Sequence, residues 1–461
     1  MKNTAAIILA AGKGTRMKSH LPKVLHKVAG KTMAEQVLSQ VHSAGIGKCY
    51  MVIGHSSREV QDTLGDIAEY VVQRPQLGTG HAVIQAIPFL SMETRAVLVA
   101  CADTPLLTAK TLKALMEEFK QGKAACTVLT AKTENPHGYG RIIRNAEGFV
   151  TGIVEEKDAT EAEKQICEVN TGTYFFDWRL LQEVLCELTN DNAQCEYYLT
   201  DTVKVLVEHG HKVTACLAAD FQETMGVNDK AQLAMAEQVL RKRKITELQL
   251  AGVTVQDPAN TYIDTEVEVG ADTVIYAGCH LRGNTVIGKN CEIGPDSQIT
   301  DTKVGDKCTI LRSVTNDVVI GNAANIGPFA YLRPGTVLAE NVKVGDFVEL
   351  KKSHIGAGSK IPHLSYVGDS VVGSKVNIGC GTITCNYDGF NKFQTIIEDG
   401  AFIGSNSNLV APIKIGANAY VAAGSTITME VSADDLAIAR GKQRNLEGRG
   451  KELREKLKNN K

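Results

Sequence analysis

Residues 397–427 read IEDGAF IGSNSN LVAPIK IGANAY VAAGST I, so an aliphatic residue opens every block of six. A period of six fits neither an α-helix nor a single β-strand, whose periods are 3.6 and 2. It is the period of a solenoid with three short faces per coil, in which the aliphatic residue points inward and small residues turn the corners. The stretch therefore predicts a parallel β-helix, stabilised by the stacking of coil on coil.

The same spacing extends back to about residue 252. A generic all-β domain with chance periodicity is the alternative, but six consecutive matches in the last series favour the β-helix. Residues 385–396 interrupt the repeat, and an insertion on a rigid solenoid is a natural place for function. The aliphatic positions are Ile287, Ile293 and Ile299, then Ile326, Leu332, Leu338, Val344 and Leu350, then Ile361, Val367, Val372 and Ile378, and finally Ile397, Ile403, Leu409, Ile415, Val421 and Ile427.

The first half of the chain has a different texture, because short apolar runs alternate with helix-compatible stretches over residues 1–228. This alternation predicts a Rossmann-like α/β domain with a mainly parallel sheet. Residues 229–250 predict a helical linker, whose basic run 241–244 we interpret as a solvated face. Residues 251–461 then form the β-helix domain, which ends in a basic tail after about residue 434.

Composition excludes several classes of protein. The 461 residues carry 50 basic and 52 acidic side chains, a net charge of −2, which gives no reason to expect nucleic acid as a partner. Twelve scattered cysteines without a CxxC pair predict neither a zinc site nor a disulfide scaffold, and fit a reducing cytoplasm. The apolar run 5–11 is too short for a signal peptide, and no stretch is long enough to span a membrane, so we expect a cytoplasmic protein without membrane contacts.

A glycine-rich loop, LAAGKGTR at residues 9–16, follows the first apolar run. Its backbone N–H groups can close on phosphate oxygens, and Arg16 and Lys23 can neutralise the charge of leaving pyrophosphate. Met17 stands where the dinucleotide motif GxGxxG needs its third glycine, which argues against an NAD enzyme. Asp103 ends a second apolar run, where a carboxylate suits Mg²⁺; the alternative is an Asp that only caps the next turn.

The glycine loop, its Arg and the downstream Pro22-Lys23 resemble the sugar-1-phosphate nucleotidylyltransferases. Further segments follow in order: residues 76–82 (QLGTGHA), 138–141 (GYGR), 170–172 (NTG) and 226–228 (GVN). With the hexads, residues 5 to 445 closely resemble the bacterial family of bifunctional N-acetylglucosamine-1-phosphate uridylyltransferases / glucosamine-1-phosphate N-acetyltransferases. The resemblance implies a left-handed β-helix, a homotrimer and the synthesis of UDP-N-acetylglucosamine, which supplies peptidoglycan and lipopolysaccharide precursors.

The resemblance also implies roles for residues of the first domain, with UTP as the co-substrate. Asp103 and Asn228 would bind Mg²⁺, and Arg16 and Lys23 would assist the transfer. Ala102 stands before Asp103 where the family usually has glycine, and we expect its methyl group to be tolerated. The residues implied for UTP or UDP-N-acetylglucosamine are Leu9, Ala10, Ala11, Gly12, Lys23, Gln73, Gly78, Thr79, Gly140, Glu155, Asn170 and Asn228.

Acetyl transfer to glucosamine needs a base, because the amine is an ammonium group at neutral pH, and a neutral imidazole is suited to that task. His363 lies in the hexad region, and the resemblance implies that it is the base. Pro362, before it, replaces a more usual small residue and would stiffen its loop; Cys380 replaces a frequent alanine. The residues implied for glucosamine-1-phosphate are Arg333, Lys351, Tyr366 and Asn377, and those for acetyl-CoA are Cys380, Asn386, Tyr387, Ser405, Ala423 and Arg440.

Two other functions remain open at this point. The chain could be a single-activity sugar-1-phosphate nucleotidylyltransferase whose β-helix is structural, which would not consume acetyl-CoA. It could also be a regulatory subunit that has lost its chemistry, although such a protein would have lost its phosphate or metal groups. The presence of His363 and Lys351 argues against the first alternative, and the presence of Arg16, Lys23 and Asp103 argues against the second.

Overall fold

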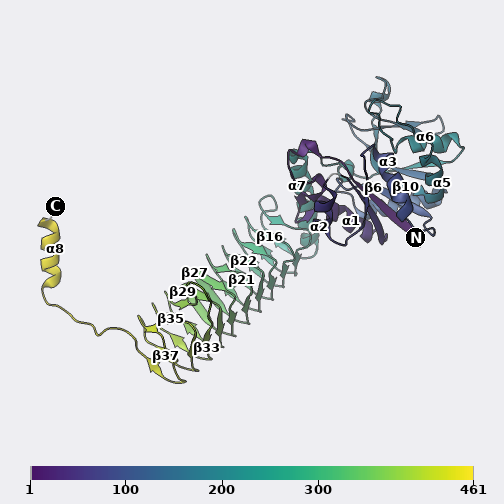
Figure 1. Cartoon of the computed structure of the whole chain (residues 1–461). Helices are drawn as coiled ribbons and strands as arrows, with labels where there is room; N and C mark the ends of the chain where they lie inside the picture. Colours follow the sequence, from purple (N-terminus) through teal and green to yellow (C-terminus); the bar gives the residue numbers. More distant parts are fainter. Residues whose placement is uncertain (1–2, 55, 460–461) are drawn as a thin grey trace. The chain divides into compact units, whose positions relative to one another are not determined.

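The structure is a computed structural model that describes residues 3–54 and 56–459. The chain forms two compact units, which meet between Arg243 and Lys244. This point lies inside helix α7 (Lys230–Leu250), which corresponds to the helical stretch expected over 229–250. Figure 1 shows the elements of both units, coloured along the sequence.

A mixed sheet forms the centre of the first unit. Its strand order is β11-β7-β10-β6-β1-β4-β5; β8 pairs with β10, and β9 pairs with β8. Neighbours in the seven-strand order run parallel except β10, which is antiparallel to β6 and β7, and the pairs of β8 with β10 and with β9 are antiparallel too. The strands are β1 (Thr4–Ala10), β4 (Lys48–Ile53), β5 (Glu69–Val72), β6 (Ala96–Cys101), β7 (Cys126–Lys132), β8 (Arg141–Arg144), β9 (Val150–Val154), β10 (Glu168–Asp177) and β11 (Val213–Leu217), besides the hairpin β2 (Lys27–Val28) and β3 (Lys31–Thr32).

Helices cover both faces of this sheet, which explains why β1 is apolar without alternation. Ile7 belongs to a core cluster with residues of α3, α5 and α6, and Ile8 belongs to a second cluster with residues of α1, α2 and α4. Both side chains are fully buried. The helices are α1 (Met33–Ser43), α2 (Ser57–Leu64), α3 (Thr79–Ala86), α4 (Ala109–Gly122), α5 (Trp178–Leu185) and α6 (Asp201–Glu208), with 3₁₀ turns at Thr15–Met17, Lys23–Leu25, Ile87–Phe89, Glu163–Gln165 and Phe221–Thr224.

The strand order reverses at β1, and this reversal positions a site. From β1 the chain continues to β4 and β5 on one side, and then crosses to β6 on the other side. Loops that leave β1 and β6 therefore diverge at the carboxyl edge of the sheet, where open α/β sheets bind their ligands. The glycine loop follows β1, and Asp103 follows β6.

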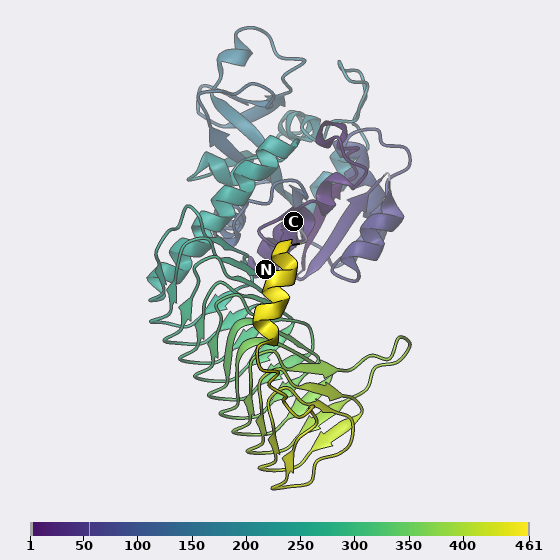
Figure 2. The same cartoon turned by 90° about the vertical axis from the view of Figure 1, so that its left-hand side faces the viewer.

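The second unit is a stack of coils, as the hexads predict (Figures 1 and 2). Ile275 pairs in parallel with Ile293, eighteen residues later, so one coil holds three hexads. All the aliphatic hexad positions named above are buried in one continuous core, which confirms that they point inward.

Two of the three faces of the coil share one sheet, and the third face forms another. The first sheet contains β12 (Thr254–Val255), β13 (Tyr262–Ile263), β15 (Val274–Ile275), β16 (His280–Arg282), β18 (Glu292–Ile293), β19 (Gln298–Thr300), β21 (Thr309–Ile310), β22 (Val314–Asn316), β24 (Asn325–Ile326), β25 (Tyr331–Leu332), β27 (Lys343–Lys351), β29 (Lys360–Gly368), β31 (Asn377–Ile378), β32 (Ile383–Cys385), β34 (Phe402–Ile403), β35 (Asn408–Val410), β37 (Tyr420–Val421), β38 (Thr426–Ile427) and β39 (Leu436–Ala437). The other contains β14 (Glu268–Val269), β17 (Val286–Ile287), β20 (Lys303–Val304), β23 (Val318–Ile320), β26 (Thr336–Leu338), β28 (His354–Ile355), β30 (Ser370–Val372), β33 (Thr395–Ile397) and β36 (Ile413–Ile415).

Three features go beyond the repeat or correct the sequence interpretation. The insertion is a small hairpin loop, closed by a bridge between Tyr387 and Lys392, and it projects from the coil stack in Figure 2. The basic tail contains a helix that the sequence analysis did not predict, α8 (Arg449–Asn459), which buries no residue. The basic run 241–244 is not simply a solvated face, because Arg243 donates to the carbonyl of Leu106 and Lys244 is buried.

None of the helices within residues 3–54 and 56–459 is both long enough and apolar enough to cross a membrane.

Candidate functional sites

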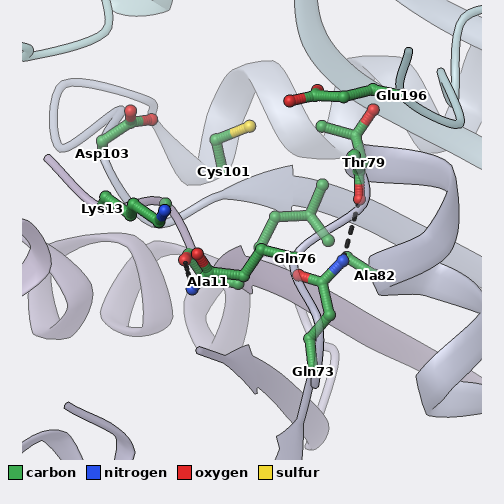
Figure 3. Close-up of a pocket in the computed structure, with 12 residues that line it drawn as sticks. Ala11, Lys13, Gln73, Gln76, Thr79, Ala82, Cys101, Asp103 and Glu196 are labelled. Atoms are coloured by element: carbon green, nitrogen blue, oxygen red, sulfur yellow. Dashed lines mark hydrogen bonds between the residues drawn. The ribbon is translucent and has the colours of Figure 1, made fainter. Parts of the chain in front are cut away.

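A pocket of about 430 Å³ opens at the carboxyl edge of β1 and β6 (Figure 3). Seven residues that the sequence analysis assigned to nucleotide or metal line it: Leu9, Ala11, Gly12, Gln73, Gly78, Thr79 and Asp103. Five residues that it did not assign also line it: Lys13, Gln76, Ala82, Cys101 and Glu196. Ala10, Arg16, Lys23, Gly140, Glu155, Asn170 and Asn228 do not line this pocket, and the last six lie in the two neighbouring groups described below.

Two glycines allow neighbouring segments to approach each other, Gly78 in the lining of the pocket and Gly14 in the glycine loop beside it. Gly14 has a φ of +61°, and a Cβ there would lie 2.6 Å from Cβ of Lys23. Gly78, at the start of α3, has a φ of +107°, and a Cβ there would lie 2.6 Å from the carbonyl oxygen of Tyr197. Any other residue would be strained at both positions and would push Lys23 or α3 away.

Gln76 fixes the glycine loop from the opposite wall. Its Nε2 donates to the carbonyl oxygen of Ala11 over 2.6 Å, and Figure 3 shows this contact at the floor of the pocket. On the same wall, Thr79 Oγ1 accepts a hydrogen bond from the backbone N–H of Leu199, 3.1 Å away. The loop and α3 are therefore held in place before any nucleotide binds, which reduces the entropy cost of binding.

Four of the predicted side chains converge beside the pocket. Lys23 Nζ donates to Asp103 Oδ2 at 2.5 Å and to Asn228 Oδ1 at 2.7 Å. Arg16 donates to the same Asn228 oxygen at 2.9 Å. The chain thus brings together, from positions up to 212 residues apart, the two residues expected to hold a metal and the two cations expected to assist phosphate transfer.

The donor set of Asp103 and Asn228 fits Mg²⁺. One carboxylate and one amide oxygen are hard donors, and Mg²⁺ prefers few protein ligands because it retains water and takes phosphate oxygens. Both oxygens already face a cation, the ammonium group of Lys23. In the described part of the chain, no group of three or more His, Cys, Asp and Glu residues could hold a metal ion, so a closed all-protein metal cage is absent there.

Three of the residues implied for UTP or UDP-N-acetylglucosamine, Gly140, Glu155 and Asn170, also lie together. Asn170 donates its backbone N–H to the carbonyl of Gly140 over 2.8 Å, and a Cβ on Gly140 would lie 3.5 Å from both Asn170 and Glu155. Glu155 accepts a hydrogen bond from Thr200 over 3.2 Å, but burial still raises the pKa of Glu155 above its ordinary value. Asn170 donates to the hydroxyl of Tyr174, so its side chain is held in place.

Ala102 is the residue that departs from the family before Asp103. Its side chain is fully buried in the core cluster that contains α1 and α4, and it does not line the pocket. Its N–H donates to the carbonyl of Leu9 over 2.9 Å, which joins the ends of β1 and β6. The extra methyl group therefore packs in the hydrophobic core and does not narrow the pocket.

In the second unit, His363 has a partner that the sequence analysis did not name. Nδ1 of His363 lies 2.8 Å from Oδ1 of Asp346, its register partner in the preceding coil. This contact lowers the pKa of Asp346, so the carboxylate stays ionised at neutral pH. An ionised Asp can only accept, so the ring carries its hydrogen on Nδ1 and exposes the lone pair of Nε2.

Four of the predicted acetyl-CoA residues lie along the corner that follows His363. The carbonyl of Cys380 accepts from the N–H of Asn406, and the carbonyl of Ser405 accepts from the N–H of Gly424. One coil further, Arg440 donates to the carbonyl of Ala423 over 2.7 Å. Cys380, Ser405, Ala423 and Arg440 therefore form a ladder along one corner of the β-helix.

A cluster near the end of β29 gathers the predicted phosphate and insertion residues. Asp369 joins them: its Oδ2 accepts from Asn386 at 2.5 Å and lies 3.6 Å from Nζ of Lys351. Asn386 also contacts the hydroxyl of Tyr366 at 3.4 Å. Arg333 pairs instead with Glu349 at 2.8 Å, a partner that the sequence analysis did not name.

Three further predictions concern Pro362, Asn377 and Tyr387, and the structure places these residues in three different surroundings. Pro362 and His363 lie inside β29, in register with β27, and not on a loop that Pro362 could stiffen. Asn377 lies in β31 beside Lys360, outside the Asp369 cluster. Tyr387 is 59% exposed on the insertion and donates its hydroxyl to Gly389.

Comparison with known proteins matches both units. Residues 6–168 match the MobA-like NTP transferase domain, and residues 266–301 and 394–428 match the bacterial transferase hexapeptide (six repeats). Residues 314–387 match the GMPPB C-terminal domain. The bifunctional protein GlmU of Geobacillus sp. (strain WCH70) is 53% identical over 442 residues, 96% of each chain, and that of Carboxydothermus hydrogenoformans is 54% identical over 441 residues, 96% of this chain and 98% of the relative.

These matches define a nucleotidyltransferase domain followed by a hexapeptide-repeat transferase, a left-handed parallel β-helix, in one chain. The chain belongs to the family of bifunctional GlmU proteins. It is therefore the bifunctional uridylyltransferase and acetyltransferase of UDP-N-acetylglucosamine synthesis that the motifs predict, and the single-activity and regulatory alternatives are set aside. The family also implies a divalent metal, small-molecule co-substrates and an oligomer.

Proposed function

We propose that the two steps of UDP-N-acetylglucosamine synthesis are divided between the two units. The β-helix acetylates glucosamine-1-phosphate with acetyl-CoA, and the α/β unit then transfers uridylate from UTP to the N-acetylglucosamine-1-phosphate so formed. The observation that carries the proposal is that each unit assembles its own set of charged groups, Lys23 with Asp103 and Asn228 in one, and His363 with Asp346 in the other.

In the acetyl step, Nε2 of His363 takes a proton from the ammonium group of glucosamine. The free amine attacks the thioester carbonyl, and its nitrogen loses a second proton to water as the amide forms. Coenzyme A leaves as the thiolate, which takes the first proton back from the imidazolium. Asp346 orients the ring, with its charge favouring the imidazolium that forms. Arg333, Lys351 and Tyr366, with Asn377, hold glucosamine-1-phosphate, while Asn386, Tyr387 and the ladder of Cys380, Ser405, Ala423 and Arg440 hold acetyl-CoA.

In the uridylyl step, an oxygen of the sugar phosphate attacks the α-phosphate of UTP in line, and pyrophosphate leaves. Such transfer depends on positioning and charge stabilisation, so no covalent enzyme intermediate is needed. The glycine loop, Gln73, Gly78 and Thr79 orient the nucleotide, and Gly140, Glu155 and Asn170 orient the sugar. Arg16 and Lys23 stabilise the charge that develops on the phosphates.

The metal of this step is proposed to be Mg²⁺, held by Asp103 and Asn228. When bound, it would supply positive charge to the phosphate oxygens. Lys23 bridges these two side chains, and with a metal held there its ammonium group would be available to contact phosphate instead. The same side chain therefore balances the two ligands before binding and serves the phosphates afterwards.

The assembly is proposed to be a homotrimer formed through the β-helix, with acetyl sites shared between neighbours. Its place is proposed to be the cytoplasm, where UTP and acetyl-CoA are available and where the cysteines, which are free thiols, stay reduced. Neither nucleic acid nor a membrane is a proposed partner.

The test is to incubate the protein with glucosamine-1-phosphate, acetyl-CoA, UTP and Mg²⁺, and to follow the coenzyme A thiol and pyrophosphate separately. The proposal expects thiol release first and an equal amount of pyrophosphate afterwards. Pyrophosphate release from glucosamine-1-phosphate without thiol release would instead indicate a single-activity nucleotidyltransferase.

A further inference from the structure

The side chain of Gln73 is held by its amide nitrogen. Nε2 lies 3.0 Å from the carbonyl oxygen of Gly78 and 3.0 Å from Nδ1 of His81. A primary amide has two hydrogens, so these two contacts occupy both of them. Gln73 is only 3% exposed, yet it lines the nucleotide pocket, and Figure 3 shows its amide oxygen on the pocket side and its nitrogen turned towards the 78–79 turn.

The Gly78 carbonyl and His81 together determine which end of this amide faces the pocket. The Gly78 carbonyl can only accept, and Nδ1 of a neutral His81 can accept if the ring hydrogen is on Nε2. Burial lowers the pKa of His81, which keeps the ring neutral. Its Nε2 faces the side-chain amide of Gln85, 3.2 Å away and one helical turn later in α3, which can turn its oxygen to accept the ring hydrogen.

His81 is itself held by its surroundings. It lies in α3, and its ring is 6.3 Å from the ring of Tyr197 at an interplanar angle of 34°. The carbonyl of Tyr197 accepts from the N–H of Gly80 over 2.8 Å, which ties the start of α3 to this segment. The imidazole therefore has a fixed position relative to Gln73, on the side away from the nucleotide.

The oxygen of the Gln73 amide faces the pocket and is a hydrogen-bond acceptor. An acceptor at this place can distinguish uracil from cytosine. Uracil carries a hydrogen on N3, whereas N3 of cytosine is a lone pair. An acceptor at this place matches uracil, while cytosine would place two lone pairs against each other in a buried wall. A site built to bond one such group commonly rejects the unmatched analogue strongly, because a buried polar group is left unpaired.

We propose that His81 is a positioning residue for base selection: its Nδ1 holds the Gln73 amide with the oxygen towards the nucleobase, so that the enzyme accepts UTP and rejects CTP. The inference rests on the proposed placement of the base of UTP against Gln73. His81 touches neither the nucleotide nor the reacting phosphates, and it acts through the orientation of a neighbouring amide.

The test compares UTP with CTP as substrates of pyrophosphate release, at saturating N-acetylglucosamine-1-phosphate, in His81→Leu and His81→Asn. Leucine removes one of the two acceptors of the Gln73 Nε2, so only the Gly78 carbonyl is left to hold the amide and its orientation is less strongly fixed. We expect the ratio of kcat/KM for UTP over CTP to fall about tenfold or more, mainly through KM. Asparagine restores an acceptor near the place of Nδ1, and we expect it to keep the ratio within about threefold of the wild-type value.

The control is Gln85→Leu, which removes the partner of the other ring nitrogen but keeps Nδ1 beside Gln73, so the ratio should fall much less than in His81→Leu. Acetyl transfer in the same preparations reports the amount of folded chain. A His81→Leu ratio within twofold of wild type, or equal losses of kcat with both nucleotides, would overturn the inference.

Gln73→Leu separates this failure from a failure of the proposed placement. If Gln73→Leu lowers the ratio and His81→Leu does not, only the role of His81 is wrong. If neither variant changes the ratio, the base does not bind at Gln73, and both the placement and the inference fail.

Discussion

Oδ1 of Asp346 lies 2.8 Å from Nδ1 of His363, across two adjacent coils of the β-helix. The two residues are seventeen positions apart in the chain, close to one full coil. The β-helix thus builds an acid–imidazole pair from two consecutive strands, without a loop to position it. Because rigid strands carry both groups, the ring orientation is fixed before substrate binds.

Asp346→Ala should therefore lower kcat of acetyl transfer by about 10- to 100-fold, since the ring loses its orienting partner. Asp346→Asn should lose less, because its amide oxygen can still accept from Nδ1. Steady-state release of the coenzyme A thiol measures both. Equal activity of Asp346→Ala and wild type would show that the contact does not orient the base.

Much of the β-helix could be predicted because buried aliphatic residues recur with its six-residue period. The pairs across coils could not, although a signal existed: Asp346 and His363, Glu349 and Tyr366, and Asp369 and Asn386 are each seventeen residues apart, and the first two of these are register partners. Hexads identify the inward position, whereas these pairs lie on outward positions, where sequence has no period. Counting back one coil of eighteen residues from His363 gives Gly345, next to Asp346, because this coil is one residue shorter.

Lys23→Met should slow uridylyl transfer by about 10²- to 10³-fold, because a charge on the phosphates is lost. It should also bind Mn²⁺ without nucleotide about tenfold more tightly than wild type, since the ammonium group no longer occupies the space between Asp103 and Asn228. Calorimetric titration with Mn²⁺ measures the second effect. Lys13→Met, which removes a lysine that lines the pocket, is the control. Unchanged Mn²⁺ affinity in Lys23→Met would contradict the role of Lys23.

The first unit was predictable at its motifs and less so between them. The glycine loop and Asp103 were found because they directly follow apolar runs that became β1 and β6. Gln76 and Glu196 were missed as site residues, because the first acts on the carbonyl of Ala11 and the second comes from a distant loop. The antiparallel course of β10 was not foreseen either, since apolar content does not encode strand direction.

Glu155→Gln should stabilise the first unit at neutral pH, although it weakens sugar binding. Burial raises the folded-state pKa of Glu155, so the folded chain holds this proton more tightly than the unfolded chain. Above the raised pKa, the ionised Glu155 therefore lowers the free energy of unfolding of the wild type. This destabilisation disappears as the pH falls towards 4.5, the ordinary pKa of a glutamate. Melting temperatures across this range should show a positive difference for Glu155→Gln that vanishes at low pH.

The neighbouring Glu156 supplies a control of opposite sign. Burial acts to raise the pKa of Glu156, but the hydrogen bond that Arg141 donates to it lowers this pKa by more. Nη2 of Arg141 lies 2.7 Å from Oε2 of Glu156. Glu156→Gln should therefore destabilise the unit at neutral pH, and this loss should fade as the pH falls through the lowered pKa. If both variants changed the melting temperature in the same direction, the assigned pKa directions would be wrong.

The most direct test of the division of labour is His363→Ala, assayed separately for each half-reaction. Coenzyme A release from acetyl-CoA and glucosamine-1-phosphate should fall by about 10²-fold or more, while pyrophosphate release from UTP and N-acetylglucosamine-1-phosphate should stay at the wild-type rate. Loss of both activities in a folded His363→Ala protein, or full retention of acetyl transfer, would contradict this division of labour.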